Sequence, residues 1–281
     1  MIAYLNGRYL PKEKICIDPD DRGFLFADGL YEVVRYYHGR PFQLVAHQKR
    51  LEKGARALRF NRTAFPEFSQ VMQQLIEKNH LQSVESAIVY FQVTRGAAPR
   101  SHRFPPKDTP LTVYAFAREF HSAIQEQKQG AGAILVEDDH WGHCDLKTIA
   151  LLPNTLAHQK ARDAGAVEAI FVRNGLVQEG THSNVAAVMN GVLYTPPLTR
   201  YVLPGITRQV IIDLCTELNI EVKEQNISPE FLLNAHEVMI IGTTVEITPI
   251  IQIDNHFIGQ KKPGPVFLEL FKRFQKLTEP D

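Results

Sequence analysis

Asn-Gly pairs constrain the fold of this chain most, because such a pair reverses an extended chain within two residues. Both residues readily adopt a positive φ, which makes Asn-Gly the strongest short signal for a tight β-hairpin. A hairpin is predicted at Asn6-Gly7, a turn at Asn174-Gly175 and another hairpin at Asn190-Gly191. His38-Gly39 predicts one more reversal, after the β-branched and aromatic run 31–37. Antiparallel strand pairs are therefore expected in both halves of the chain.

Helical patterns alternate with these strand patterns. Apolar residues at helical spacing predict helices over 44–58, 65–78 and 266–277, a helix after the turn Pro204-Gly205, and a short helix near 229–234. Apolar runs predict further strands over 87–94, 111–116, 131–136, 169–172, 220–222, 237–242 and 246–253. The chain is expected to have a mixed α/β (α+β) fold.

The length predicts two domains. A single hydrophobic core rarely grows beyond about 250–300 residues, and this chain has 281. Residues 121–130 are polar, weakly periodic and end in Gly, as is typical of a linker. We expect an N-terminal α/β domain over 1–120, an interdomain linker over 121–130 and a C-terminal domain over 131–281.

Charge and composition narrow the class of protein. The chain has 31 basic and 31 acidic residues, so it lacks the basic surface that nucleic acid binding requires. Its three cysteines have no metal-like spacing and favour a reducing compartment over a disulfide scaffold. No apolar signal core or membrane-length run is present. We expect a cytoplasmic protein that uses no metal and binds neither nucleic acid nor membrane.

Lys147 is the first candidate catalytic residue. It lies between the apolar run 131–136 and a helical pattern that begins near Ile149. A lysine in the first turn of a helix is disfavoured by the helix dipole, by roughly 0.3–1 kcal/mol at exposed sites. This placement would favour the neutral amine, which is the form that Schiff-base chemistry requires. The alternative is an ordinary solvated lysine at a helix shoulder.

Three further features fit a phosphorylated ligand. A turn that opens a helix offers free N–H groups and the positive end of the dipole, and hydroxyl or guanidinium groups add donors. The features are Ile206 and Thr207 after the turn Pro204-Gly205, the pair Thr243-Thr244 after a strand, and Arg50. Each also has an ordinary interpretation, as a simple turn, as strand residues and as a surface arginine.

Glu179 is a candidate partner for a heterocyclic nitrogen. The segment around it, Gln178-Glu179-Gly180, has too few apolar residues for a buried strand and too much glycine for a helix. Pyridoxal phosphate requires a lysine for a Schiff base, a carboxylate for its ring nitrogen and donors for its phosphate. The candidates match these requirements, although a large α/β chain often contains the same residue types.

Seven segments together resemble the fold-type IV pyridoxal-phosphate enzymes. The resemblance extends over nearly the whole chain, in order and at the spacing of that family. The segments are DRGFLFADGLYEVVR (21–35), HQKRL (47–51), YFQVTRGAAPRSHRFP (90–105), CDLKTIALLPN (144–154), EGTHSNV (179–185), LPGITR (203–208) and GTTVEITP (242–249). The family includes D-amino-acid aminotransferases, branched-chain aminotransferases and aminodeoxychorismate lyases.

The resemblance implies a fold, a cofactor and a set of cofactor-binding residues. The fold would have a smaller N-terminal α/β domain and a larger C-terminal domain with a barrel-like sheet. Lys147 would form the Schiff base with pyridoxal 5'-phosphate and move the proton, and Glu179 would pair with the pyridine nitrogen. Leu203 would lie against the ring. The phosphate would be bound by Arg50, Ile206, Thr207, Thr243 and Thr244.

The D-amino-acid aminotransferase subgroup resembles this chain most. Its signature is an Arg-x-His pair together with Tyr31. In this chain the pair is Arg100 and His102, in the loop between the predicted strands 87–94 and 111–116. In that subgroup these residues bind the substrate α-carboxylate, and the loop reaches across the interface of a homodimer. The expected reaction exchanges the amino group of a D-amino acid, such as D-alanine, with a 2-oxo acid, such as 2-oxoglutarate.

Two departures and three alternatives accompany this resemblance. His182 stands where the subgroup more often has a small hydroxyl residue, and Ala150 replaces an Asn that is common shortly after the lysine. The alternatives are an aminodeoxychorismate lyase, which releases pyruvate and p-aminobenzoate, a branched-chain L-amino-acid aminotransferase, and a non-catalytic binding protein. The pair Arg100 and His102 argues against the lyase.

Overall fold

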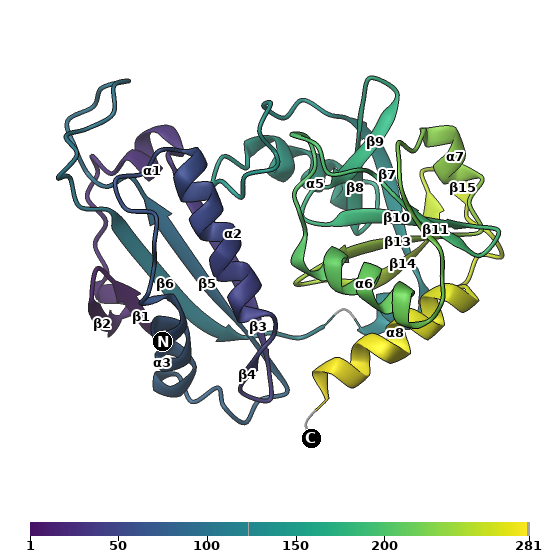
Figure 1. Cartoon of the computed structure of the whole chain (residues 1–281), viewed down its shortest axis with the longest axis horizontal. Helices are drawn as coiled ribbons and strands as arrows, with labels where there is room; N and C mark the ends of the chain where they lie inside the picture. The colour runs from purple at the N-terminus through teal and green to yellow at the C-terminus, as the bar shows by residue number, and fades with distance from the viewer. Residues whose placement is uncertain (123, 280–281) are drawn as a thin grey trace. The chain divides into compact units, whose positions relative to one another are not determined.

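A computed structural model of the chain describes residues 1–122 and 124–279 (Figure 1). The chain divides into two compact units. Unit 1 contains Met1–His121 and Leu146–Ala150, and unit 2 contains Ser122–Asp145 and Leu151–Glu279. The expected division differs in two respects, because it made 121–130 a separate linker, most of which belongs to unit 2, and it assigned all of 131–281 to the second domain. The segment Leu146–Ala150 leaves that domain because its backbone pairs with a strand of unit 1.

The expected linker over 121–130 has a structure of its own. Residue 123 lies outside the described residues, but helix α4 spans Ile124–Gln129 and packs against strand β14 (Glu246–Ile253). Gln127 is buried, and its Nε2 donates to Glu246 Oε2 over 2.7 Å. This polar segment therefore contains a short helix with one buried side-chain amide, which its composition did not predict.

Unit 1 is built on a six-stranded antiparallel sheet in the order β2-β1-β6-β5-β3-β4. Its strands are β1 (Ile2–Leu5), β2 (Arg8–Pro11), β3 (Gly29–Tyr37), β4 (Arg40–Pro41), β5 (Ser86–Thr94) and β6 (Thr112–Glu119). Two short helices, η1 (Lys12–Lys14) and α1 (Arg22–Phe26), lie between β2 and β3 in chain order. The predicted hairpins at Asn6-Gly7 and His38-Gly39 are confirmed, and all four residues have positive φ.

Two amphipathic helices pack on the sheet of unit 1. Helix α2 (Leu44–Ala57) contacts β3, and α3 (Phe68–Lys78) contacts β1, β5 and β6. The apolar residues that predicted these helices form the core, in which the rings of Phe68 and Phe91 meet edge to face at 4.9 Å. Apolar burial of this kind is the main stabilising contribution in such a unit.

Unit 2 is built on a nine-stranded mixed sheet, with eight strands in the order β12-β11-β10-β13-β14-β7-β8-β9 and β15 paired to β14. Its other strands are β7 (Ala131–Glu137), β8 (Glu168–Arg173), β9 (Leu176–Gly180), β10 (Asn184–Met189), β11 (Val192–Thr195), β12 (Val222–Glu224), β13 (Glu237–Gly242) and β15 (His256–Phe257). Strand β9, at one end of the order, also packs against β10. The sheet is therefore curled, which confirms the expected barrel-like form.

Four further helices belong to unit 2: α5 (Leu152–Asp163), α6 (Ile206–Glu217), α7 (Pro229–Leu233) and α8 (Pro265–Thr278). Helix α5 packs on β8, α6 packs on β13, and α8 packs on α6, β13 and β14 (Figure 1). The helices predicted from apolar spacing are present, and the turns at Asn174-Gly175 and Asn190-Gly191 join β8 to β9 and β10 to β11.

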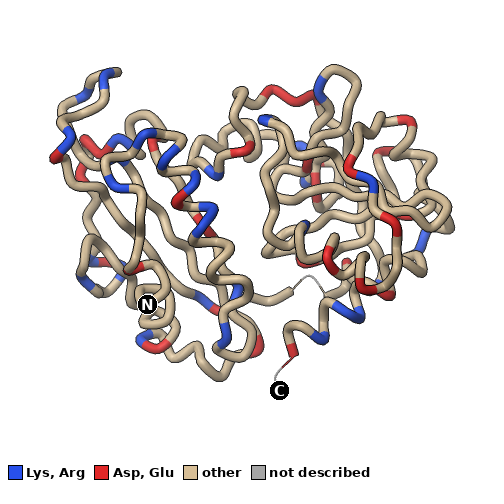
Figure 2. Tube along the Cα trace, viewed as in Figure 1, with Lys and Arg blue, Asp and Glu red and all other residues tan. Residues whose placement is uncertain are grey.

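Charged residues of both signs are interspersed along both units, as the even charge balance predicts (Figure 2). The three cysteines Cys16, Cys144 and Cys215 are free thiols. Among the described residues, no helix has the length and apolar character needed to cross a membrane.

Candidate active site

Lys147 lies in an extended segment that pairs with the start of β3. The Tyr31 N–H donates to the Lys147 carbonyl over 3.0 Å, and the Ile149 N–H donates to the Gly29 carbonyl over 3.1 Å. The expected place in the first turn of a helix is wrong, because α5 begins only at Leu152. Lys147 is fixed by strand pairing instead, so the helix dipole does not account for its chemistry.

Gly29 allows this close approach. A Cβ at Gly29 would lie 2.7 Å from Ile149 Cδ1 and 2.9 Å from the Val93 carbonyl oxygen. Both distances are shorter than real Cβ contacts, so a side chain at this position would clash with the β5 backbone and with the Ile149 side chain.

The amine of Lys147 faces an aromatic ring. Its Nζ lies 4.3 Å from the centre of the Tyr31 ring, and Tyr31 itself stacks on Tyr90 at 5.6 Å. Within the described part of unit 1, Lys147 has no carboxylate in ion-pair contact. The half-buried amine is therefore held by the backbone and an aromatic face, which leaves its nitrogen available for covalent chemistry.

Arg50 forms a buried ion pair beside this segment. Its Nε and Nη2 each donate to one oxygen of Glu32 over 2.7 Å, and His47 Nδ1 lies 2.7 Å from Glu32 Oε2. The Glu32 side chain is fully buried on β3, and both partners come from α2. A bidentate arginine–carboxylate pair of this kind fixes the guanidinium plane. Arg50 was expected as a phosphate ligand, and at least two of its nitrogens bind Glu32.

The electrostatics of this cluster follow from burial and charge. Burial alone would raise the pKa of Glu32, but the charge and hydrogen bonds of Arg50, with those of His47, outweigh it and lower the pKa to about 2. Burial lowers the pKa of His47, against the opposing effect of Glu32, and the charges of Arg50 and Lys147 add to the decrease. Glu32 is thus ionised and His47 neutral near pH 7.

Arg100 and His102 lie in the exposed loop between β5 and β6. The Arg100 guanidinium lies 5.2 Å from the Phe26 ring, and the His102 ring lies 5.6 Å from the same ring. The loop is anchored by Arg22, whose Nη1 donates to the carbonyls of Ser101 and Arg103 over 2.7 and 3.2 Å. The structure therefore holds the two side chains together on α1, and their assignment to a substrate carboxylate stays a prediction.

In unit 2, Glu179 lies on a strand, and a backbone N–H binds its carboxylate. It lies in β9, so the expectation that its segment is too poor in apolar residues for a strand is wrong. Val177, Glu179 and Gly180 of β9 are buried, because the curled sheet packs β9 against β10. Its Oε2 accepts the Leu203 N–H over 2.8 Å and lies 3.5 Å from Asn184 Nδ2.

Asn184 connects Glu179 to the start of α6. Its Nδ2 also donates to the Leu203 carbonyl over 3.0 Å. A Cβ at Gly205 would overlap Asn184 Oδ1, so a side chain there would have to displace the Asn184 amide. Leu203, which was expected to contact a cofactor ring, therefore also positions the Glu179 carboxylate through its backbone.

The first turn of α6 contains Ile206 and Thr207. Gly205 is its N-cap residue, no side chain caps the helix, and no acidic residue lies in the first turn. The first N–H groups of a helix have no acceptor inside the helix and mark an anion site with the positive end of the dipole. Thr207 is almost fully buried and adds a hydroxyl. This geometry fits the expected phosphate role.

Thr243 and Thr244 form the turn between β13 and β14 and are half-exposed. Gly242, just before them, lies close to the loop that follows Glu179, since a Cβ there would be 3.2 Å from the His182 carbonyl oxygen. Unit 2 thus contributes a carboxylate, an uncapped helix N-terminus and the hydroxyls of Thr207, Thr243 and Thr244.

Sequence reasoning missed several residues that position these groups. Glu32 gave the clearest signal, because it is a charged residue inside an apolar strand pattern and must therefore have buried partners. His47 and Asn184 lie in the family motifs HQKRL and EGTHSNV, and Gly205 lies in a predicted turn. The sequence indicated no positioning role for them, because their contacts join segments that are far apart in the sequence.

Comparisons with known proteins identify the family of the chain. The family model described as "Amino-transferase class IV" matches residues 29–253. A D-alanine aminotransferase of Bacillus licheniformis is 40% identical over 267 residues, covering 95% of this chain and 93% of that protein. A D-alanine aminotransferase of Staphylococcus haemolyticus is 36% identical over 278 residues, covering 99% and 98%.

Solved structures show the same fold. The branched-chain amino acid aminotransferase of Escherichia coli superposes with a TM-score of 0.89 at 29% identity, covering 99% of this chain and 94% of that one. A branched-chain amino acid aminotransferase of Thermobaculum terrenum, in its PLP-form, gives 0.85 at 25% identity, covering 99% and 93%. The family that the sequence motifs predicted is confirmed: the chain belongs to the class IV aminotransferases.

Proposed function

We propose that this protein is a pyridoxal-phosphate-dependent aminotransferase that exchanges the amino group of a D-amino acid, such as D-alanine, with a 2-oxo acid, such as 2-oxoglutarate. The placement of Lys147 carries the proposal, because strand pairing fixes its backbone and its amine is not bound by a carboxylate in the described part of unit 1. The relatives named D-alanine aminotransferase support the substrate class.

The donor set fits pyridoxal phosphate. The ring nitrogen needs a fixed carboxylate, and Glu179 is held by the Leu203 N–H. The phosphate needs uncompensated donors, which Ile206 and Thr207 at the start of α6 supply, with Thr243 and Thr244. Arg50, whose guanidinium binds Glu32, is retained as a proposed phosphate donor on the family resemblance. Relatives of known structure carry PLP, pyridoxamine 5'-phosphate or a phosphopyridoxyl adduct.

When bound, the cofactor supplies an aldehyde that condenses with amines and a ring that accepts electrons from the carbon being deprotonated. The protein residues do the rest. Lys147 would hold the cofactor covalently, and its amine would remove and return the proton as general base and acid. Glu179, held by the Leu203 N–H, would keep the ring nitrogen protonated, and the Leu203 side chain would pack against the ring.

The substrate carboxylate is proposed to bind Arg100, His102 and Tyr31. A guanidinium is a permanent cation with paired donors, and an imidazole is a tunable one, which together suit a carboxylate. The shared contact of Arg100 and His102 with Phe26 supports a joint role. We further propose a homodimer and a cytoplasmic location, in keeping with the three free thiols.

Replacing Lys147 by Ala tests the observation on which the proposal rests. We expect the absorbance of the covalently bound cofactor to disappear and transamination to fall by at least roughly 10²–10⁴-fold, the size of the acid–base contribution alone. The measurements are the visible spectrum and the turnover with D-alanine and 2-oxoglutarate. A K147A protein that keeps both properties would remove Lys147 from the mechanism.

A panel of amines distinguishes the reactions. Conversion of the bound cofactor to its amine form by D-alanine, and not by L-alanine or L-leucine, supports the D-amino acid assignment. Conversion by L-leucine alone would favour a branched-chain L-aminotransferase, which is the activity named for the solved neighbours. Release of p-aminobenzoate from aminodeoxychorismate would instead identify a lyase, and a spectrum that no amine changes would indicate a binding protein.

Replacing Arg100 by Ala tests the carboxylate site. A hydrogen bond to a charged group contributes about 1.5–3 kcal/mol, so KM for D-alanine should rise roughly ten- to hundredfold. Cofactor affinity should stay unchanged. Arg103→Ala, in the same exposed loop, is the matched control and should leave KM unaltered. Equal losses of substrate and cofactor affinity in R100A would contradict the assignment.

A further inference from the structure

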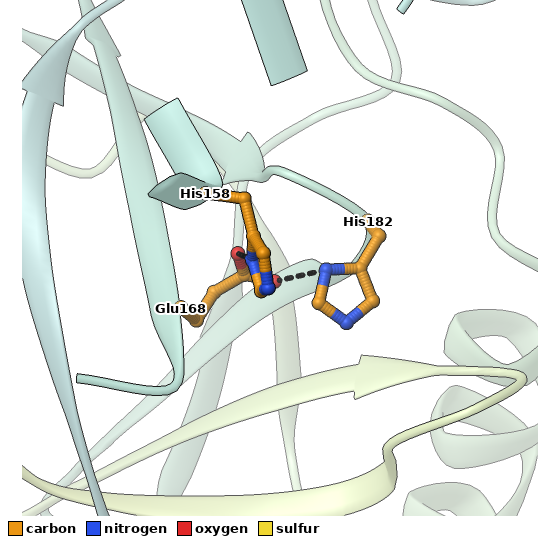
Figure 3. Close-up of side chains that lie close together, drawn as sticks. All are labelled: His158, Glu168 and His182. Atoms are coloured by element: carbon orange, nitrogen blue, oxygen red, sulfur yellow. Dashed lines mark ion pairs between the residues drawn. The ribbon is translucent and has the colours of Figure 1, made fainter. Parts of the chain in front are cut away.

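Two partly exposed histidines of unit 2 converge on one buried glutamate, and one of them, His182, is a position at which the chain departs from its subgroup (Figure 3). His158 lies on α5, Glu168 begins β8, and His182 lies in the loop between β9 and β10. Their ligand atoms all lie within 4.8 Å of one another. None of these three residues has a role in the proposed transamination.

We propose that His158, Glu168 and His182 bind a late first-row divalent cation, with Zn²⁺ as the test ion. Two imidazoles and a carboxylate are a donor set that such ions prefer. The kind of ion follows from these three side chains alone. The site is therefore independent of the transamination proposed above.

The distances are close to those of a metal site. In a tetrahedral zinc site the bonds of about 2.0–2.2 Å place the ligand atoms about 3.3 Å apart. His182 Nδ1 lies 3.2 Å from Glu168 Oε2, and His158 Nδ1 lies 3.9 Å from Glu168 Oε1. Figure 3 shows both rings directed at the carboxylate. Small rotations of the two imidazoles would complete the geometry.

The carboxylate is oriented by a shell of donors, as metal ligands usually are. Glu168 Oε1 accepts the N–H groups of Ala169 and Thr181, each over 3.0 Å, and the Thr181 hydroxyl. Oε2 accepts the Ser183 hydroxyl over 2.7 Å. Oε1 is therefore the fixed oxygen, and Oε2, beside His182, is the oxygen that faces the ion.

The histidines of the cluster are more exposed to solvent than the glutamate. The Glu168 side chain is fully buried, whereas those of His158 and His182 are each 39% exposed. A cation can therefore reach the two imidazoles from solvent. Among the described residues, the ion-pair partners of Glu168 are only these histidines, so no lysine or arginine neutralises its charge in direct contact.

The experiment is a titration of the purified holoenzyme with Zn²⁺ by calorimetry, in buffer free of chelators. The variants are His158→Gln and His182→Ser, because both side chains are partly exposed and their loss leaves the buried Glu168 contacts in place. His256→Gln, an exposed histidine elsewhere in unit 2, is the matched control.

We expect one Zn²⁺ per chain in the natural protein and in H256Q. Loss of an outer-shell partner usually lowers metal affinity about 10–100-fold, so loss of a ligand in H158Q or H182S should lower it at least tenfold. Thermal unfolding should agree, with Zn²⁺ raising Tm in the natural protein more than in either variant.

Two results would overturn the proposal. The first is the absence of saturable Zn²⁺ binding by the natural protein. The second is equal affinity in all four proteins, which would locate the ion elsewhere. A Co²⁺ titration identifies that case, because a thiolate charge-transfer band would mark binding at a cysteine such as Cys144.

Discussion

At the scale of single residues, the buried carboxylate of Glu32 connects stability to the placement of Arg50. Its charge is balanced by a bidentate bond from Arg50 and a contact with His47, inside the core of unit 1. Removal of one member of a buried ion pair leaves the other charge without compensation, which costs more than the pair itself contributes. Glu32 therefore stabilises unit 1 and also fixes the side chain of Arg50, a candidate phosphate ligand.

Glu32→Gln should lower the free energy of unfolding by about 3–5 kcal/mol near pH 7. Glu85→Gln, the same chemical change at an exposed position of unit 1, should stay within about 0.5 kcal/mol. The measurement is chemical denaturation followed by a probe of unit 1. An E32Q protein as stable as E85Q would show that Arg50 needs no buried counter-charge.

The loss of unfolding free energy caused by E32Q should depend on pH. The folded pKa of Glu32, about 2, is below its ordinary value of 4.5, so the unfolded chain binds the proton first as pH falls. The stabilisation is fully present above pH 4.5 and is lost as pH falls towards 2. The difference between the natural protein and E32Q should accordingly shrink over that range. A constant difference would contradict the assigned ionisation.

At the scale of elements, the contact between Asn184 on β10 and Gly205 at the start of α6 holds the unit 2 residues in place. Asn184 also bonds the Leu203 carbonyl and lies beside Glu179, so one amide fixes the carboxylate and the chain entering the helix. The helix N-terminus can approach this amide only because position 205 has no Cβ.

Gly205→Ala should displace Asn184, destabilise the protein by about 1–3 kcal/mol and weaken pyridoxal phosphate binding. Gly132→Ala is the matched control, because its nearest neighbour to a new Cβ, Ala166 Cα, is 4.0 Å away. The two measurements are Tm and the dissociation constant of the cofactor. Normal cofactor affinity in G205A would show that Glu179 does not depend on this contact.

At the scale of the whole molecule, the chain order and the structural units do not coincide. Leu146–Ala150 comes from the second half of the sequence but belongs to unit 1, where it brings Lys147 to β3. The proposed homodimer would add a second departure from chain order, with Arg100 and His102 acting on the substrate of the partner subunit.

Mixing two defective proteins tests that arrangement. Lys147→Ala and Arg100→Ala are unfolded together and refolded as a mixture. If the loop acts across the interface, each heterodimer has one site with both residues intact, and activity should recover well above that of either variant alone. If each loop serves its own chain, no intact site forms and activity should stay low. Separately refolded variants are the control.

Much of this protein follows from its amino-acid sequence alone. Turn chemistry at Asn6-Gly7 and Asn190-Gly191, together with helical apolar spacing, predicted the hairpins and helices, because those signals depend on neighbouring residues. The ordered motifs also predicted the family, which the comparisons confirm. The roles of Arg50, Glu179 and the other site residues remain predictions of the same origin.

How those residues are held depends on the packing of distant segments. Lys147 is fixed by pairing with β3 rather than by a helix, and Glu179 lies in a strand that the curled sheet covers. Glu32 obtains its partners from α2, and Asn184 meets Gly205 across two segments. Local patterns record backbone preference and burial, whereas these contacts depend on which remote parts of the chain fold against each other.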